Sequence, residues 1–172
     1  MLFRSSGASA TLAFSEGDGA KVIDSSLTIT DIDDSNIESA TVTISSGFQS
    51  AEDVLAFLDT SSITGSWDAS TGVLTLTGTA TKAQYETALE SVTYNNTSEN
   101  PNTSNRTISW LVNDGTVNSS AATSTISVAA ANDAPVISGA SATLAFAEGD
   151  GAKVIDSSLT ITDIDDSNIE SA

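Results

Sequence analysis

Residues 106–112, Arg106-Thr107-Ile108-Ser109-Trp110-Leu111-Val112, alternate between polar and large apolar side chains over most of their length. This period of two places apolar side chains on one face of a strand and hydroxyl groups on the other. Clusters of Gly, Asp, Asn and Ser, which favour turns, separate the segments of this kind. The other segments are residues 10–14, 26–30, 40–44, 73–77 and 124–128. Together they predict an all-β fold, an antiparallel β-sandwich.

Two short segments instead have the features of helix starts. Ser50 precedes Val54–Leu58, and Thr81 precedes Tyr85–Leu89. In both cases a hydroxyl-bearing residue is followed three positions later by an acceptor side chain, which is the spacing of a capping box. We therefore expect one or two short helices, the second of which covers an open end of the sandwich.

The sequence also repeats itself. Residues 6–40 return as residues 138–172 with one difference, Ser15 against Ala147, at an offset of 132 residues. A period of this length matches an independently folding domain and is too long for a solenoid unit. The prediction is one complete module, residues 1–133, followed by a linker and the first third of a second module, residues 134–172. Near-identical modules suit a stalk or spacer better than an enzyme.

The composition excludes several classes of function. Five Lys and Arg against 23 Asp and Glu give a net charge of −18, which disfavours binding to nucleic acid and to anionic membranes. Without Cys or His, the chain has no thiol nucleophile, no His-based triad and no usual zinc site. No apolar run is long enough to span a membrane. We expect a protein without catalytic residues, nucleic-acid partners or membrane insertion, whose acidic balance suits hard cations.

An acidic turn is the strongest candidate for a binding site. Asp31, Asp33, Asp34 and Asn36 place four oxygen-bearing side chains within six residues. Alternate residues of an extended segment point to one side, so Asp31 and Asp33 can converge on one cation. No basic residue lies within nine positions to offset the crowded carboxylates. These residues favour calcium, although not in an EF-hand, and a solvated loop held by side-chain turns is the alternative reading.

Several motifs resemble those of cadherins. The linker Ala131-Asn132-Asp133-Ala134-Pro135-Val136-Ile137 resembles the junction between cadherin repeats, and Asp31-Ile32-Asp33-Asp34-Ser35-Asn36 resembles their Asp-x-Asp motif. Asn113-Asp114-Gly115 resembles the cadherin Asp-Gly turn. The stretch from Tyr94-Asn95-Asn96 through Arg106-Thr107-Ile108-Ser109 to Gly115 is similar to cadherin-like repeats of large bacterial RTX and type I secreted adhesins.

The resemblance implies a cadherin- or immunoglobulin-like Greek-key sandwich at the bacterial cell surface. Its implied partners are neighbouring repeats and host-surface or matrix ligands. It further implies calcium bound between successive modules. The ligands implied at the junction are Glu16, Asn132, Asp133, Asp163, Asp165 and Asn168. The ligands implied for half of an equivalent site at the other end of the module are Asp31, Asp33, Asn36 and Asp114. The chain has no clear counterpart of the cadherin Asp-Arg-Glu motif, and the second copy ends before a counterpart of the Asp114-Gly115 turn. Both departures lower the expected affinity.

Two functions from different classes therefore remain open. One is a calcium-stiffened structural repeat of an adhesin, and the other is a carbohydrate- or protein-binding module in which Trp67 contacts a ligand. The burial of Trp67 distinguishes them. Trp67, Tyr94 and Trp110 are predicted to be core residues, because aromatic side chains at strand positions usually pack inward. Arg106, at the start of a strand, is predicted to pair with an acidic loop.

Overall fold

The computed structural model describes residues 4–6 and 9–170, which divide into two compact units with the boundary between Ala131 and Asn132. The strands of the first unit are β1 (Arg4–Ser6), β2 (Thr11–Ser15), β3 (Lys21–Val22), β4 (Thr28–Thr30), β5 (Asn36–Ser46), β6 (Asp53–Ala56), β7 (Thr64–Asp68), β8 (Val73–Thr81), β9 (Thr93–Asn96), β10 (Arg106–Asn113) and β11 (Ala122–Ala129). Helix α1 (Lys82–Glu90) lies between β8 and β9 in sequence. The second unit contains β12 (Val136–Ser138) and β13 (Thr160–Thr162).

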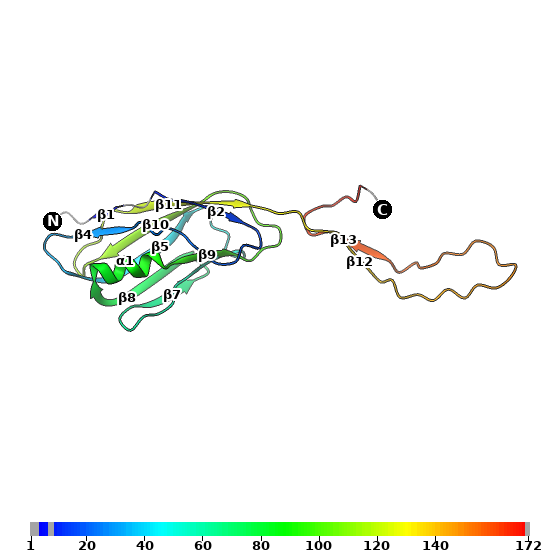
Figure 1. Ribbon diagram of the computed structural model, residues 1–172, viewed down its shortest axis with the longest axis horizontal. Coiled ribbons are helices and arrows are strands. Elements are labelled where there is room, and N and C mark those ends of the chain that lie inside the picture. Colours follow the sequence, from blue (N-terminus) through cyan, green and yellow to red (C-terminus); the bar gives the residue numbers. More distant parts are fainter. Residues whose placement is uncertain (1–3, 7–8, 171–172) are drawn as a thin grey trace. The chain divides into compact units, whose positions relative to one another are not determined.

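The larger sheet of the first unit has six strands in the order β2-β11-β10-β5-β8-β7 (Figure 1). Strand β10, which contains the alternating stretch of residues 106–112, pairs with β5 on one side and β11 on the other. Its inward side chains are Arg106, Ile108, Trp110 and Val112, all of them buried. The prediction of an all-β sandwich is confirmed, and each of the six predicted strand segments overlaps an observed strand.

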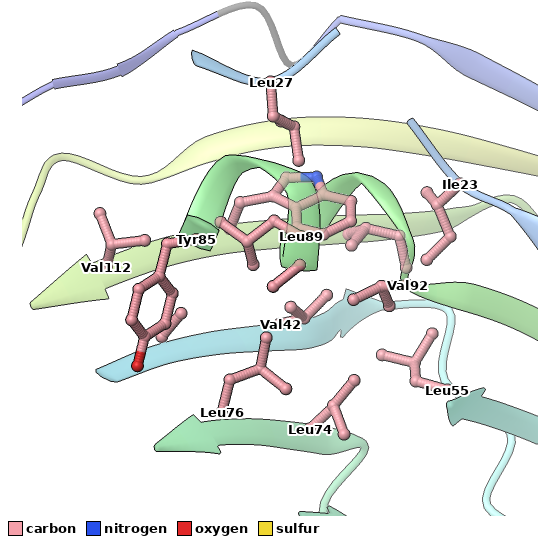
Figure 2. Close-up of a cluster of buried hydrophobic side chains, with 14 of the residues drawn as sticks. Ile23, Leu27, Val42, Leu55, Leu74, Leu76, Tyr85, Leu89, Val92 and Val112 are labelled. Carbon is pink, nitrogen blue, oxygen red and sulfur yellow. The ribbon is translucent and has the colours of Figure 1, made fainter. Parts of the chain in front are cut away.

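A smaller sheet, in the order β3-β9-β6, completes the sandwich. The ring of Phe14 on β2 meets that of Tyr94 on β9 edge to face, with centroids 5.0 Å apart, so the two sheets are in direct contact. Figure 2 shows the apolar side chains of both sheets and of α1 meeting in one cluster, which includes Leu55, Leu74, Leu76 and Val92. Burying this apolar surface is the main source of stability for the fold.

Helix α1 confirms the second of the two predicted helices. The Thr81 hydroxyl accepts the backbone N–H of Gln84, and the Gln84 side chain accepts the backbone N–H of Thr81, which is the predicted capping box. Tyr85, Ala88 and Leu89 are the buried residues of the helix, and they pack against the core.

The first predicted helix, Val54–Leu58, is wrong. Residues from Asp53 to Ala56 form strand β6, which pairs with β9. The Asp53 carboxylate accepts the backbone N–H of Gln49 and forms an ion pair with Arg106, 53 residues further along the chain. The local capping signal was therefore overridden by a distant partner.

One pair of strands departs from the predicted antiparallel arrangement. Strand β2 runs parallel to β11, from Thr11 opposite Thr125 to Ser15 opposite Ala129. All other strand pairs in the described part of the chain are antiparallel. The N-terminal segment thus completes one edge of the larger sheet.

Candidate metal centre

Asp31 lies just after β4, at the start of a tight turn. Its Oδ1 accepts the backbone N–H groups of Asp33 and Asp34, at 3.2 and 3.3 Å. This carboxylate therefore folds the chain back on itself, and the predicted acidic turn is confirmed. The side chain is buried, with 9% of its surface exposed.

Asp114 follows β10 and organises a second turn in the same way. Its Oδ1 accepts the N–H groups of Thr116 and Val117, at 2.7 and 2.8 Å. Gly115 adopts a φ of +95°, a left-handed conformation that glycine adopts readily. Only 6% of the surface of Asp114 is exposed.

The second carboxylate oxygens of these two residues are the chemically notable feature of the site. Oδ2 of Asp31 and Oδ2 of Asp114 are both buried, and neither has a hydrogen-bond partner among the described residues. A buried carboxylate oxygen without a partner costs free energy, so a cation that fills this place would stabilise it. Residues 83 positions apart in sequence supply the two oxygens.

Both carboxylates are ionised at neutral pH. Hydrogen bonds from Val117 and Thr116 hold the pKa of Asp114 below its usual value. Burial acts to raise the pKa of Asp31, but hydrogen bonds from Asp33 and Asp34 outweigh it, so the net direction is downward. The negative charge of Asp114 opposes that lowering, because the two carboxylates repel one another. Two like charges held together in this way favour a divalent cation between them.

A lysine lies beside this pair, although none is near it in sequence. The Nζ atom of Lys82, the first residue of α1, donates to the backbone carbonyls of Asp31 and Asp34, at 2.7 and 2.8 Å. The distance in sequence to the nearest basic residue therefore does not describe the charge around the turn in the folded chain. The ammonium group is bonded to main-chain carbonyl oxygens, and the Oδ2 atoms of Asp31 and Asp114 remain without a hydrogen-bond partner in the described structure.

The other two predicted ligands of this half-site, Asp33 and Asn36, are less buried than Asp31 and Asp114. Asp33 is exposed, and its side chain interacts with that of Asp31. Asn36 is half-buried at the first position of β5, opposite Thr81. Asp34, which was part of the acidic cluster but not a predicted ligand, accepts the backbone N–H groups of Ser35 and Asn36 and so closes the turn.

The predicted junction residues of the second unit form a similar turn. Asp163 accepts the N–H groups of Asp165 and Asp166, as Asp31 does those of Asp33 and Asp34. Oδ2 of Asp165 accepts the backbone N–H of Asp133, at 3.1 Å. Asn132 donates to the carbonyl of Asp133, and the backbone N–H of Asn168 donates to Asp166.

Glu16 belongs to the first unit, where it follows β2. Its N–H donates to the carbonyl of Ala129, and its carboxylate accepts the N–H of Ala131, both at 2.9 Å. The glutamate therefore continues the pairing of β2 with the end of β11, immediately before the linker.

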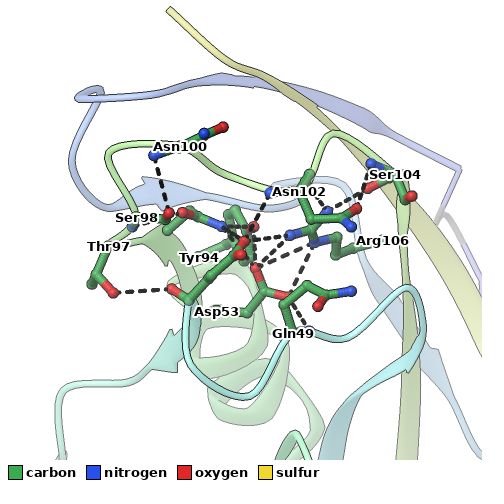
Figure 3. A network of polar contacts seen from close by, with 11 residues as sticks. Gln49, Asp53, Tyr94, Thr97, Ser98, Asn100, Asn102, Ser104 and Arg106 are labelled. Carbon is green, nitrogen blue, oxygen red and sulfur yellow. Dashed lines mark hydrogen bonds and ion pairs between the residues drawn. The ribbon is translucent and has the colours of Figure 1, made fainter. Parts of the chain in front are cut away.

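A buried ion pair lies apart from the acidic turns (Figure 3). Nε of Arg106 is 3.0 Å from Oδ2 of Asp53, and the Tyr94 hydroxyl and Asn96 amide donate to Oδ1 of the same carboxylate. The predicted structural role of Arg106 is confirmed, because its guanidinium pairs with Asp53, the first residue of β6, and with Glu52 in the turn before it. The sequence did not reveal Asp53 as that partner.

The aromatic residues meet the expectation only in part. Tyr94 and Trp110 are fully buried, whereas Trp67, on the edge strand β7, is half-buried. Its ring packs edge to face against Phe48, with centroids 6.2 Å apart. Trp67 is thus neither a full core residue nor a free ring on an open face. A groove of about 560 Å³ lies elsewhere, between α1 and the loop that contains Leu58 and Ile63.

One known protein provides a sequence comparison. The chain is similar to halomucin from Haloquadratum walsbyi, strain DSM 16790 / HBSQ001. The two are 45% identical over 86 residues, which cover 47% of this chain and 1% of halomucin. No known protein family matches the sequence, and no solved structure matches it. The more specific assignment to bacterial RTX adhesins stays a prediction.

The described residues contain no helix with the length and apolarity needed to cross a bilayer.

Proposed function

We propose that this chain is a structural repeat of an extracellular surface protein, and that calcium binds at the ends of the module and stiffens its connection to neighbouring repeats. The repeat acts as a stalk or spacer and performs no catalysis. Its partners are other repeats of the same protein. This proposal combines the internal repeat, the acidic turns and the similarity to halomucin.

The observation that carries the calcium part is the pair of buried oxygens of Asp31 and Asp114. Each side chain uses one oxygen to build its own turn and leaves the other without a hydrogen-bond partner among the described residues. Carboxylate oxygens are the ligands that calcium prefers, and a low pKa keeps them deprotonated and ready to bind. A solvated loop would leave these oxygens exposed to water.

The extracellular part rests on the relative. The similarity to halomucin, 45% identity over 86 residues, supports an extracellular surface module. The aligned segment is 1% of halomucin, so a repeat within a much longer protein is the natural reading of the comparison. The whole protein's ligands and partners are not implied by so short a segment.

Calorimetric titration of the full chain with calcium tests the proposal. The titration is carried out at high, constant NaCl, so that screening of the charge of −18 does not change as calcium is added. We expect a dissociation constant of about 0.1–1 mM, as in other extracellular calcium modules, and weaker binding of magnesium. At a calcium concentration ten times the dissociation constant, binding to the folded state should add about 1–2 kcal/mol to the free energy of unfolding.

Matched variants locate the site. Asp114→Asn should weaken calcium binding about tenfold or more, because it removes a charged ligand but preserves the shape of the turn. Asp68→Asn is the control. Asp68 also organises a turn, in which its carboxylate accepts the backbone N–H and the hydroxyl of Ser70, and the substitution removes the same charge. Equal affinities for the two variants, or no binding up to about 10 mM calcium, would show that the proposed site is wrong.

A further inference from the structure

The two turns of the candidate metal centre differ in how they are held. In the Asp114 turn, the carboxylate accepts the N–H groups of Thr116 and Val117 at 2.7 and 2.8 Å. In the acidic turn, residues 31–35, the Asp31 carboxylate accepts its two N–H groups at 3.2 and 3.3 Å, the long end of the range for such bonds. The acidic turn therefore closes itself less firmly than the Asp114 turn does.

The acidic turn is also held from outside, by helix α1. Nζ of Lys82 donates to the carbonyl of Asp31 at 2.7 Å and to that of Asp34 at 2.8 Å. Both hydrogen bonds are charge-assisted, and they are shorter than the two that the Asp31 carboxylate accepts. Because they join the first residue of the turn to its fourth, one ammonium group fixes the course of the main chain between them.

The position of Lys82 is itself well defined. It is the first residue of α1, where the capping box of Thr81 and Gln84 sets the start of the helix. Its backbone N–H donates to the carbonyl of Ser35 at 3.4 Å, and Thr81 lies opposite Asn36 in the pairing of β5 with β8. The side chain of the lysine is half-buried. The ammonium group thus extends from a firmly held part of the fold.

A second charged side chain of α1 holds the strand that leads into the acidic turn. Helix α1 lies beside β4 (Figure 1), and Glu86, one helical turn after Lys82, accepts the backbone N–H of Ile29 at 2.7 Å. A carboxylate thus binds an N–H group before the turn, and an ammonium group binds carbonyl oxygens within it. Helix α1 braces the segment that carries Asp31.

Electrostatic attraction does not explain why a lysine lies at this place. A positive group beside a cation site repels the cation and should weaken its binding. Lys82 is one of only five basic residues in the chain. Its ammonium group is bonded to main-chain carbonyls, whereas the buried Oδ2 atoms of Asp31 and Asp114 have no hydrogen-bond partner among the described residues. The lysine therefore supports the main chain and leaves these two oxygens available.

We propose that Lys82 is a positioning residue of the calcium site, which holds the acidic turn so that Oδ2 of Asp31 is fixed toward Asp114 before the cation binds. This inference rests on the proposed calcium function and names the group that prepares its site. Folding orders the turn in advance, so calcium binding bears less of that entropic cost. Lys82 thus lowers calcium affinity by repulsion and raises it by positioning, and positioning is the larger effect.

Lys82→Met separates the two effects by their sign. Methionine has no donor and no charge, so loss of the repulsion should strengthen calcium binding, whereas loss of the tether should weaken it. High salt sharpens the comparison, because at about 1 M NaCl charges more than about 3 Å apart are largely screened. In high salt we expect Lys82→Met to bind calcium about tenfold more weakly than the wild type. The loss should be smaller in low salt, where the variant also escapes the repulsion.

The amide resonances of Thr116 and Val117 restrict the measurement to this site. Their N–H groups donate to the Asp114 carboxylate. In a calcium titration of the isotope-labelled full chain followed by NMR, the shifts of these two resonances report binding at Asp114. Calcium bound at another acidic turn of the chain therefore does not enter the measured affinity.

Two further variants serve as controls for Lys82→Met. Lys21→Met removes the same charge from an exposed ion pair with Asp18, and it should bind calcium as the wild type does in high salt. Lys82→Arg retains the charge and can donate to both carbonyls, so it should recover most of the affinity that Lys82→Met loses.

Hydrogen exchange measured without calcium tests the positioning itself. In Lys82→Met, the amides of Asp33 and Asp34 should exchange at least about tenfold faster than in the wild type, because opening of the acidic turn no longer breaks the bonds to the lysine. The amides of the Asp114 turn, which closes itself with short hydrogen bonds, should exchange as before. A general loss of stability would accelerate exchange in both turns alike.

Three results would overturn the proposal. The first is calcium binding by Lys82→Met that equals or exceeds that of the wild type in high salt. The second is equal acceleration of exchange in both turns, since the lysine then contributes only to the stability of the module. The third is a Lys82→Arg variant that binds calcium as weakly as Lys82→Met. If the wild type binds no calcium up to about 10 mM, the calcium proposal itself fails and this inference with it. Binding by the wild type together with any of the three results refutes the role of Lys82 alone.

Discussion

Arg106 and Asp53 form an ion pair sealed inside the sandwich, with Nε of the arginine 3.0 Å from Oδ2 of the aspartate and neither side chain exposed. The pair joins the start of β10 to the start of β6, which belong to different sheets. Glu52 lies near the same guanidinium, and backbone carbonyls of Asn102 and Ser104 accept its remaining N–H groups. These hydrogen bonds and ion pairs offset the desolvation cost of burying the charged groups.

Breaking this pair on one side should be strongly destabilising. Asp53→Leu leaves the buried Arg106 guanidinium without its carboxylate, and Arg106→Met leaves the buried Asp53 carboxylate without its guanidinium. Each substitution should therefore lower the free energy of unfolding by about 3–5 kcal/mol. The double variant removes both charges and should recover a large part of that loss. Urea unfolding measures all three. Lys21→Met, at the exposed pair with Asp18, is the control and should change little. Losses that simply add in the double variant would contradict this account.

The ion pair also shows why the sequence predicted the fold better than its details. Alternation located six strands because each carries its own apolar face, as Ile108 and Trp110 do. The capping pattern before Val54 failed because Asp53 is held by Arg106, a contact that no local pattern contains. Short strands such as β3 are defined by their neighbours, here β9, and have no period of their own.

The candidate site was predictable to a similar degree. Spacing identified Asp31 as part of an acidic cluster, but only the family resemblance linked it to Asp114, 83 residues away. The approach of Lys82 to the carbonyls of Asp31 and Asp34 had no sequence signal, because the helix brings it there across the fold. Local chemistry is thus readable from the chain, and the pairing of distant groups requires the structure.

Acid should destabilise the module through carboxylates with lowered pKa values. Burial acts to raise the pKa of Asp24, but hydrogen bonds from Ser26 and Ser124 more than offset it, and the pKa values of Asp31 and Asp114 are also lowered. The folded state therefore binds protons less readily than the unfolded state, whose Asp pKa is about 3.9. The stabilisation is present above that pH and is lost as the pH falls below it toward the folded values.

Thermal melts between neutral pH and about pH 2 check this expectation. The melting temperature should be nearly constant down to about pH 5 and should then fall. Asp24→Asn should be less stable than wild type at neutral pH and should show a shallower fall, because one of the linked groups no longer titrates. Protonation also reduces the net charge of −18, which acts in the opposite direction. A melting temperature that rises on acidification would show that lowered carboxylate pKa values do not dominate the pH dependence of stability.

Gly78 provides a last prediction, because its place in β8 has no room for a side chain. Its φ is +134°, and a Cβ atom would lie 2.0 Å from the carbonyl oxygen of Ser62. Its own carbonyl accepts the Tyr85 hydroxyl, at 2.7 Å, and so ties β8 to α1. Gly78→Ala must displace a backbone on one side and disturb this hydrogen bond on the other. We expect the free energy of unfolding, measured with urea, to fall by about 3 kcal/mol or more.

Gly17→Ala is the matched control for Gly78→Ala. The φ of Gly17 is +76°, but nothing lies within 4 Å of the added Cβ, so only the backbone penalty of about 1–2 kcal/mol applies. Equal losses at the two positions would mean that the contact with Ser62 is relieved at little cost and that the edge formed by β7 and β8 is more compliant than its packing indicates.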